Sequence, residues 1–412
     1  MKKLEQRNNI RIFNQIRIID LLKKEKMTLT TLAEHLNISF TAVSHIVEDM
    51  VNQKIVKFSS KKSVNARGRI PTFVELNTDI GVVCAIDLSS KDIQIIIASL
   101  DGKVLGKDEI QNAVFISKEH LNIIEDKIKN LLASPALSKY KLLSICISSP
   151  GLIRRDTQEY VNAYRIIDFA KMNPVLHFSN AFGVNVEMHN DIKIACLAEL
   201  KFGAFPTRPF NGIFVHIGSS SGLSFVINGK IYEGTNGYSG EMPLFVGNDP
   251  VITADTNYNW RLFSFWEMQN RINEYKGIPI INPNDGVDIT KIVEDYKRGD
   301  KYTVDAVEES CKRNALTLIA LSTLLDIEYI VVEGPVQMLG DSYIQKLSRY
   351  AMEFSDYDIR TRIVPSKVGI DGSTVGACYQ ASSMYFLEKI ENVTKKRIKV
   401  DNVELYTNYK EI

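Results

Sequence analysis

The hydrophobic pattern at the start of the chain has the period of an α-helix. Apolar residues recur every three or four positions from about residue 10 to 25, which predicts a first amphipathic helix. A second helix is predicted over 29–36, with Thr28 or Thr30 available as its N-cap. We expect it to end at Asn37, because asparagine adopts the left-handed backbone of a helix end more readily than most residues.

A third helix is expected directly after Ser39, whose hydroxyl can cap it. The face expected to be buried carries Val43, Ile46, Val47 and Met50, and the opposite face carries Phe40, Thr41, Ser44, His45 and Glu48. Two helices joined by a short turn predict a helix-turn-helix, whose second helix presents its N-terminal residues to base edges in the major groove. The candidate DNA-contacting residues on this helix are Ser39, Phe40, Thr41, Ser44 and His45.

Alternating residues after the third helix predict a β-hairpin, with strands at 55–58 and 73–76. The connection between them carries four basic candidates, Lys61, Lys62, Arg67 and Arg69. Two arginines around a glycine suit a narrow, electronegative minor groove. We therefore expect residues 1–76 to form a winged helix-turn-helix DNA-binding domain. The alternative is a three-helix protein-interaction module with a basic loop.

From residue 77 onward the pattern changes to short strands, and one arrangement of elements occurs twice. The first copy has predicted strands at 81–87, 93–100 and 103–105, a helix at 118–132 and a strand at 142–147. The second copy has predicted strands at 212–217, 224–227 and 230–233, a helix at 304–325 and a strand at 329–333. The fold class is therefore α/β, and a repeated unit of this kind predicts two similar lobes with a cleft between them.

The charge of the chain is distributed unevenly, although the net charge is only +1. Residues 1–75 hold 14 Lys and Arg against 7 Asp and Glu, a balance of +7, and the remainder holds 36 against 42, a balance of −6. A basic head on an acidic body indicates a polyanionic partner such as nucleic acid. A solvated basic tail is the alternative.

The cysteines and the hydropathy add expectations about compartment. The five cysteines are scattered singly, with no C-x-x-C pair, so we expect buried thiols in a reducing compartment: Cys84, Cys146, Cys196, Cys311 and Cys378. No stretch has the apolar core of a signal peptide or the roughly 20 apolar residues of a membrane span. We expect a cytoplasmic protein with no membrane partner.

Two parts of the sequence resemble one known family. Segment 27–47 and the basic run at 67–71 are similar to the helix-turn-helix and wing of repressors in the ROK family (repressor, open reading frame, kinase), although Ala42 stands where those repressors usually have threonine. The order of motifs in the body is similar to that of ROK sugar kinases and their regulator relatives. The resemblance implies an actin-like, duplicated ribonuclease-H-like sensor domain over 77–390, with 391–412 as a C-terminal extension.

The resemblance also locates two phosphate loops that differ from those of the kinases. The first kinase loop, D-x-G-x-T, reads D-L-S-S-K over 87–91, and the second, G-T-G-x-G, reads G-S-S-S-G over 218–222. Ser89 and Ser220 replace glycines that would let backbone amides approach a triphosphate, and Lys91 replaces a hydroxyl. We therefore expect no ATP binding, no kinase activity and no cofactor.

The sugar-binding motifs are better preserved. Asn190 and Asp191 match the pair with which the family binds sugar hydroxyls, and Asp191 is a vestigial base candidate that would act here as a hydrogen-bond acceptor. Asn162 and Glu241 match two further ligand-binding positions. The family's zinc histidine and cysteine cluster are absent, because M-P-L follows Glu241 and no cysteine lies between Cys196 and Cys311. We expect no metal.

The sequence as a whole predicts a transcriptional repressor of carbohydrate-metabolism genes. We expect it to bind double-stranded operator DNA as a homodimer or homotetramer and to respond to a sugar or sugar-phosphate effector held between the lobes. One alternative is an active sugar kinase with an accessory DNA-binding domain. The other is a regulator that binds no small molecule and keeps the degenerate cleft only as a scaffold.

Overall fold

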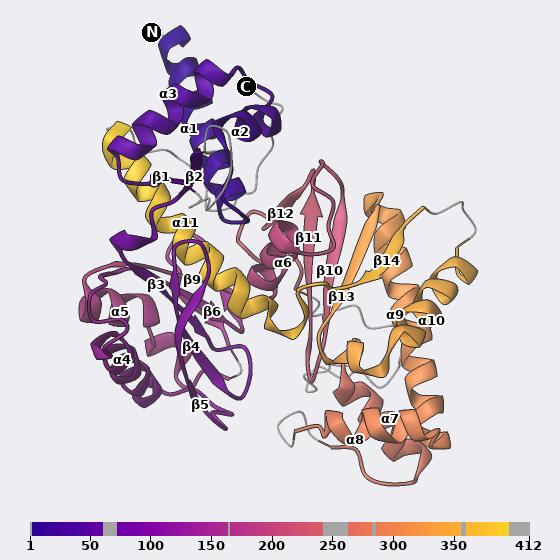
Figure 1. The fold of residues 1–412 in the computed structure, drawn as a ribbon. Coiled ribbons are helices and arrows are strands. Elements are labelled where there is room, and N and C mark those ends of the chain that lie inside the picture. The colour runs from indigo at the N-terminus through magenta and orange to yellow at the C-terminus, as the bar shows by residue number, and fades with distance from the viewer. Residues whose placement is uncertain are drawn as a thin grey trace, which may run out of the picture. The chain divides into compact units, whose positions relative to one another are not determined.

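The computed structural model describes residues 2–60, 72–163, 165–241, 263–281, 286–355 and 360–394. These residues form two units (Figure 1). The first unit contains the described residues up to Asp191 together with those from Thr374 onward, and the second unit contains Ile192–Ser373. Each unit is built on its own five-stranded sheet.

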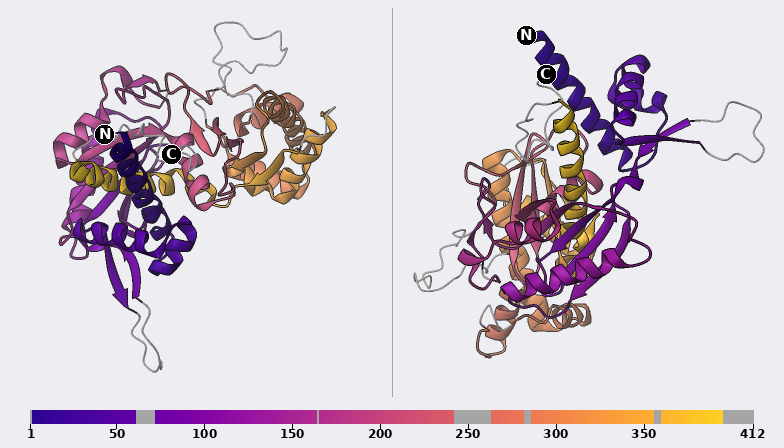
Figure 2. Two further views of the ribbon diagram at one scale, coloured as in Figure 1. Left: turned by 90° about the horizontal axis from the view of Figure 1, so that it is seen from above. Right: turned by 90° about the vertical axis from the view of Figure 1, so that its left-hand side faces the viewer.

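The N-terminal part of the first unit consists of three helices followed by a hairpin. Its elements are α1 (Lys2–Leu22), α2 (Leu29–Leu36), α3 (Phe40–Asn52), β1 (Val56–Ser60) and β2 (Thr72–Leu76). The two strands pair antiparallel, with Val56 opposite Leu76 (Figure 2). The first helix begins earlier than its hydrophobic period indicated, because residues 2–9 are mostly good helix formers without an apolar stripe. The predicted order of helix, helix, turn, helix and hairpin is confirmed.

Side-chain caps define the turn between α2 and α3 as the sequence indicated. The Thr28 hydroxyl accepts a hydrogen bond from the Thr31 amide at 3.1 Å, and the Ser39 hydroxyl accepts one from the Ala42 amide at 3.2 Å. Asn37 ends α2 in left-handed backbone, with φ 55°. The predicted buried face of α3 is confirmed in full: Val43, Ile46, Val47 and Met50. The three helices therefore pack around one small core.

The remainder of the first unit is a mixed sheet with helices on both faces. Its strands are β3 (Val82–Asp87), β4 (Ile93–Ser99), β5 (Val104–Ile110), β6 (Leu142–Ser149) and β9 (Asn185–Asn190), in the order β5-β4-β3-β6-β9. Helices α4 (Lys118–Ala133) and α5 (Pro174–Phe182) close a core over one face, and α11 (Gly372–Thr394) crosses the other (Figure 1). A short pair, β7 (Leu152–Ile153) and β8 (Tyr160–Asn162), lies between β6 and α5 in the chain.

The second unit repeats this sheet. Its strands are β10 (Gly212–Ile217), β11 (Ser221–Ile227), β12 (Lys230–Tyr232), β13 (Tyr329–Glu333) and β14 (Arg362–Pro365), in the order β12-β11-β10-β13-β14. In both sheets the first three strands in the chain are antiparallel and the last two are parallel to the first. The predicted duplication is confirmed.

Among the described residues, five helices accompany the second sheet. They are α6 (Asp191–Phe202), α7 (Phe265–Tyr275), α8 (Ile289–Arg298), α9 (Lys301–Leu325) and α10 (Asp341–Glu353). A continuous apolar core joins the sheet to α7, α8, α9 and α10. The sequence reasoning predicted α9 but missed α7, α8 and α10, although α8 and α10 carry apolar residues at helical spacing.

Candidate functional site

The N-terminal end of α3 exposes most of the residues predicted to contact DNA. Phe40 is 53% exposed, although its side chain is large and apolar, and Thr41 and His45 are exposed beside it. Ser44 is only half-buried rather than fully outward, and its hydroxyl donates to Glu48 at 3.3 Å. Exposed side chains on a capped and packed helix are held at fixed spacing, as reading of base edges requires.

The four basic residues predicted for the wing, Lys61, Lys62, Arg67 and Arg69, lie outside the described residues. Their role stays a prediction. A basic residue that the sequence reasoning did not single out has a structural role in the head. Arg17 donates to the carbonyls of His35 and Leu36, each at 3.1 Å, and so satisfies the C-terminal end of α2 from α1.

The first altered phosphate loop is occupied by the protein's own groups. The carboxylate of Asp87 accepts hydrogen bonds from the Ser89 amide at 2.9 Å and from the Thr374 hydroxyl at 3.0 Å. Arg165 donates to five backbone carbonyls around the loop, at 2.7 to 3.1 Å: Leu88, Ser89, Ser90, Ala113 and Val114. A phosphate cradle needs free amides, whereas here the Ser89 amide is used and the loop carbonyls are pinned by Arg165.

The partly buried position of Arg165 was revealed by the structure and not by the sequence. Burial lowers the pKa of its guanidinium, against the raising effect of the nearby Asp191, Asp87 and Asp92 carboxylates. An arginine in a loop has no sequence pattern that would distinguish a buried clamp from a surface charge, so sequence reasoning did not find it.

A histidine lies against the first glycine of the second altered phosphate loop, in the second unit. His216 Nδ1 lies 2.5 Å from Oε2 of Glu333, a buried carboxylate at the end of β13. A Cβ atom on Gly218 would lie 2.5 Å from the imidazole Nε2, and a Cβ atom on Gly334 would lie 3.1 Å from Nδ1. The imidazole therefore occupies the space between these two glycine turns. A buried carboxylate in this place also disfavours a polyphosphate through like charge.

The predicted sugar-contacting residues of the first unit meet at one Pro-Gly turn. The Asn190 side-chain amide donates to the carbonyl of Gly151 at 3.2 Å, and Asp191 follows it as the first residue of α6. Gly151 has φ 109°, and a Cβ atom there would lie 2.7 Å from the carbonyl oxygen of Asn162. Only glycine allows this approach, which brings the strand of Asn162 to the same turn as Asn190.

A buried tyrosine lies behind the same turn. The Tyr160 hydroxyl is 2.6 Å from the Ser149 hydroxyl, and burial raises the pKa of Tyr160 above its ordinary value, with the Asp191 charge raising it further. Tyr160 is therefore a neutral hydrogen-bonding group at all physiological pH values. Amide, carboxylate and hydroxyl groups in one place are the donors and acceptors that polyol recognition uses.

In the second unit, segment 233–241 is held by backbone geometry. Gly240 has φ 92°, and a Cβ atom there would lie 2.1 Å from the carbonyl oxygen of Leu223. The ammonium group of Lys193 donates to the carbonyl of Gly237. Glu241, the predicted ligand residue of this segment, is exposed.

Glu199, by contrast, has a structural role. It is buried, its Oε2 accepts from the Ala204 amide at 2.6 Å, and its Oε1 accepts from the Val368 amide at 2.8 Å.

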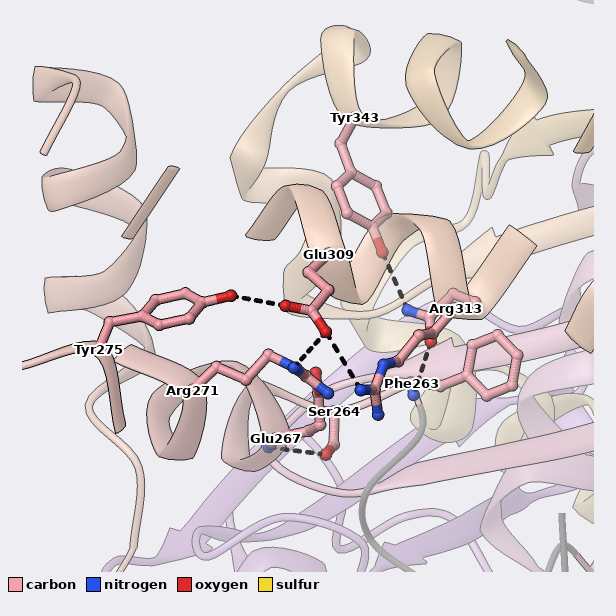
Figure 3. A network of polar contacts seen from close by, with 9 residues as sticks. Phe263, Ser264, Glu267, Arg271, Tyr275, Glu309, Arg313 and Tyr343 are labelled. Carbon is pink, nitrogen blue, oxygen red and sulfur yellow. Dashed lines mark hydrogen bonds and ion pairs between the residues drawn. The ribbon is translucent and has the colours of Figure 1, made fainter. Parts of the chain in front are cut away.

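Two acidic residues of the second unit, Glu267 and Glu309, take part in a network of ion pairs and hydrogen bonds (Figure 3). Arg271 on α7 pairs with Glu267 and with Glu309 on α9, and the Tyr275 hydroxyl donates to Glu309 at 2.5 Å. Arg313 adds a contact to Glu309 at 3.1 Å. Burial raises the pKa of Glu267, although Arg271 lowers it. The network joins α7 to α9 and has the character of a structural ion-pair cluster.

Metal and thiol chemistry have little support in the part of the chain that the structure describes. There, no group of three or more His, Cys, Asp or Glu residues could hold a metal ion. All five cysteines are buried and unpaired. Burial raises the pKa of Cys311 and of Cys378 to about 12, so both are protonated and unreactive near neutral pH. None of the described helices is long and apolar enough to cross a membrane.

The geometry defines a class of protein: a winged helix-turn-helix on a duplicated two-lobed α/β fold of the sugar-kinase type, in which protein side chains contact both phosphate loops. Residues 83–243 match the model of the ROK family. The similarity to this family lies in that part of the chain.

The curated relatives include both repressors and a kinase. The xylose repressor of Bacillus subtilis is 26% identical over 252 residues, which are 60% of this chain and 63% of the repressor, so the match spans less than two thirds of that relative. The xylose repressor of Caldicellulosiruptor bescii is 20% identical over 357 residues, 79% of this chain and 84% of that protein. The N-acetylmannosamine kinase of Escherichia coli is 23% identical over 296 residues, 72% of this chain and 97% of the kinase.

Solved structures show the same fold. A ROK family transcriptional regulator, a homologue of the Escherichia coli MLC protein, is 18% identical and covers 93% of this chain and 99% of its own, with a TM-score of 0.73. The ROK hexokinase of Thermus thermophilus is 16% identical and covers 76% of this chain and 100% of its own, with a TM-score of 0.60. Regulators and kinases share this fold, so side chains rather than topology must separate the two functions.

Proposed function

We propose that the chain is a cytoplasmic transcriptional repressor of carbohydrate-metabolism genes. In this proposal residues 1–76 are the DNA-binding domain, 77–390 are the sensor domain and 391–412 are an extension. The observation that carries it is the exposed N-terminal end of α3, where Phe40, Thr41 and His45 project from a helix fixed by the Ser39 cap. The relatives named xylose repressor support the same assignment.

The proposed operator contacts come from α3 and from the wing. Ser39, Phe40, Thr41, Ser44 and His45 would read bases in the major groove, and Lys61, Lys62, Arg67 and Arg69 would bind phosphates or the minor groove. Paired half-sites are the usual geometry for such heads, so we propose a homodimer or homotetramer.

The proposed effector is a sugar or sugar phosphate. Asn162, Asn190 and Asp191 of the first unit offer amide and carboxylate groups at one turn, and Glu241 of the second unit is proposed as a further ligand-binding residue. The effector would act only through a difference in its affinity for the DNA-binding and non-binding states.

We propose that the chain is not an enzyme. The support is chemical: the Asp87 carboxylate uses the Ser89 amide, Arg165 binds the carbonyls of the first phosphate loop, and His216, paired with Glu333, lies against Gly218 of the second. An active sugar kinase is the second candidate, because Asp191 is retained and the kinase relative from Escherichia coli is similar over most of its length. Turnover of MgATP with a hexose panel would favour the kinase.

The testing experiment is a gel-shift titration of the full chain against the DNA upstream of its own gene and its neighbours, at moderate salt, with and without a sugar panel that begins with D-xylose. We expect specific binding that one sugar or sugar phosphate alters. A Phe40→Ala, His45→Ala double variant should lose specific binding, whereas Glu34→Ala on the exposed side of α2 is a matched surface control. No specific DNA binding by the unaltered chain would reject the proposal.

The same titration distinguishes a sugar-responsive repressor from a regulator that binds no small molecule. Specific DNA binding that no sugar changes, together with no thermal shift by any sugar, would assign the chain to regulators without a small-molecule effector. A sugar that raises the free energy of unfolding by about 2.7 kcal/mol at a hundredfold excess over its Kd would exclude that alternative.

A further inference from the structure

Helix α11 contacts two parts of the first unit that are far apart in the sequence. Toward the sheet, the Ser144 hydroxyl on β6 donates to the carbonyl of Ala381 at 2.6 Å, and the Ser382 hydroxyl donates to the carbonyl of Leu100 at 2.6 Å. Toward the head, Tyr379 and Ser383 of the same helix contact residues at the end of α1. One helix of 23 residues therefore touches both the sensor sheet and the DNA-binding head.

The contact with the head centres on Lys23, which is only 8% exposed. Its ammonium group donates to the Ser383 hydroxyl at 2.6 Å and to the Tyr379 carbonyl at 3.2 Å, and it lies 3.7 Å from the centroid of the Tyr379 ring. The Tyr379 hydroxyl in turn donates to Oδ1 of Asp20 at 2.5 Å. We call Asp20, Lys23, Tyr379 and Ser383 the α1–α11 dock.

Burial of an ammonium group is unfavourable unless hydrogen bonds and a π face replace its water. The dock supplies two hydrogen-bond acceptors and one ring face to the Lys23 ammonium group. Because these partners are directional, they can all be used only when α1 and α11 have one relative orientation. An apolar contact of the same size would tolerate sliding. A head that was merely tethered to the body by its linker would need no such arrangement.

Two further residues of α11 contact the first altered phosphate loop and strand β9. The Thr374 hydroxyl donates to Asp87 of the first altered phosphate loop at 3.0 Å. The Gln380 side chain donates at 3.1 Å to Glu187 on β9, the strand that ends at Asn190. Thr374 and Ser383 lie nine residues apart on this one helix, about 14 Å along its axis, so a shift of α11 would move both contacts together.

We propose that the α1–α11 dock fixes the orientation of the DNA-binding head on α11, and that α11 thereby couples the head to the residues at Asp87 and β9. Lys23 is a positioning residue: it is buried against α11 and acts on DNA binding through the orientation of α3. This inference rests on the proposed function of the chain as a DNA-binding regulator.

A fixed head binds a duplex with two half-sites at a lower orientational cost than a loose one. A single half-site imposes no relative orientation, so its affinity should not depend on the dock. This difference gives a readout that damage to the head itself would not produce.

The first measurement uses no DNA. In the full chain, Lys23→Met keeps the length of the side chain and removes its charge, and Tyr379→Phe keeps the ring and removes the bond to Asp20. We expect faster amide hydrogen exchange in the last turn of α1 and around 379–386 in both variants. Lys24→Met is the matched control, because Lys24 is the exposed neighbour with the same charge.

The second measurement uses a duplex selected from random DNA by the unaltered chain, and a fragment that keeps one of its half-sites. We expect Lys23→Met to weaken binding to the paired site about tenfold and to leave the single half-site unchanged. Unchanged hydrogen exchange, or equal losses on both duplexes, would overturn the positioning role while the proposed function stood. If the unaltered chain selected no DNA, the proposed function would fail, and the positioning role with it.

Discussion

His216 and Glu333 form a hydrogen-bonded pair at the carboxyl ends of two parallel neighbouring strands, with Nδ1 2.5 Å from Oε2. The two residues face each other in the register of β10 and β13. The His216 imidazole lies against the glycines that follow the two strands, Gly218 and Gly334. In a kinase of this fold the first of these turns would bind phosphate, so the pair bears directly on whether the chain can use a nucleotide.

Removing one member of this pair should destabilise the second unit. His216→Leu leaves a buried carboxylate without its partner, and we expect a loss of about 2 kcal/mol in the free energy of unfolding. The double variant His216→Leu, Glu333→Leu should recover part of this loss, since no charge is then buried. The measurement is urea unfolding followed by tryptophan fluorescence, because Trp266 lies on α7 of the second unit. Strictly additive losses would contradict a direct pair.

Arg165 should not be replaceable by lysine. A lysine ammonium cannot reach the five carbonyls that the guanidinium contacts, so Arg165→Lys should lower the free energy of unfolding of the first unit by about 2 kcal/mol or more. Amides 88–90, 113 and 114 should exchange faster with deuterium. Arg154→Lys, at an exposed position, should leave the same amides unchanged. An unchanged free energy of unfolding in the Arg165→Lys variant would show that the carbonyl contacts contribute little to stability.

The wing should contribute phosphate contacts. Arg67→Ala and Arg69→Ala should each weaken operator binding and reduce the slope of log affinity against log salt by about 1 per phosphate contact removed. The measurement is fluorescence anisotropy with the operator at several salt concentrations. Arg154→Ala, an exposed charge outside the head, should leave the slope unchanged. Unchanged affinity in both wing variants would reject the wing assignment.

Asp191 should be required for the effector response rather than for DNA binding. Asp191→Asn keeps the size of the side chain but loses the negative acceptor, so the sugar-induced rise in Tm should fall to near zero while operator binding without sugar remains. Differential scanning fluorimetry with the sugar panel, beginning with D-xylose, measures this. Asp168→Asn, at an exposed position of the same unit, is the control. A full sugar response in Asp191→Asn would remove this residue from the site.

The buried thiols should make the fold sensitive to high pH. The pKa of Cys311 and of Cys378 is raised from an ordinary value of 9.0 to about 12, so the unfolded chain loses these protons at a lower pH than the folded chain. The stabilisation is complete below pH 9 and is lost as the pH rises from 9 toward 12, by about 1.4 kcal/mol per pH unit for each thiol. Urea unfolding at pH 8 to 10.5 measures this slope. Cys311→Ala should reduce it, and an unchanged slope would contradict the assignment.

The local structure of this protein could be predicted from the sequence. The cap at Ser39, the left-handed Asn37 and the buried face of α3 were predicted residue by residue, and Thr28 was one of two candidates for the other cap, because each feature depends on neighbours within one or two turns of chain. The duplicated strand order was predictable too, since strand period and turn residues are local signals that occur twice. Ser89 and Ser220, which stand where the kinases have glycine, could be identified directly in the sequence.

The tertiary structure alone decided what occupies the altered loops and what holds the head. Arg165 reaches carbonyls 51 to 77 residues away in the chain, His216 meets Glu333 across 117 residues, and Lys23 meets Tyr379 and Ser383 across about 360. No periodicity connects such positions. A lone lysine, arginine or histidine is most often a solvated surface charge, and only packing of distant elements removes its water and makes it specific.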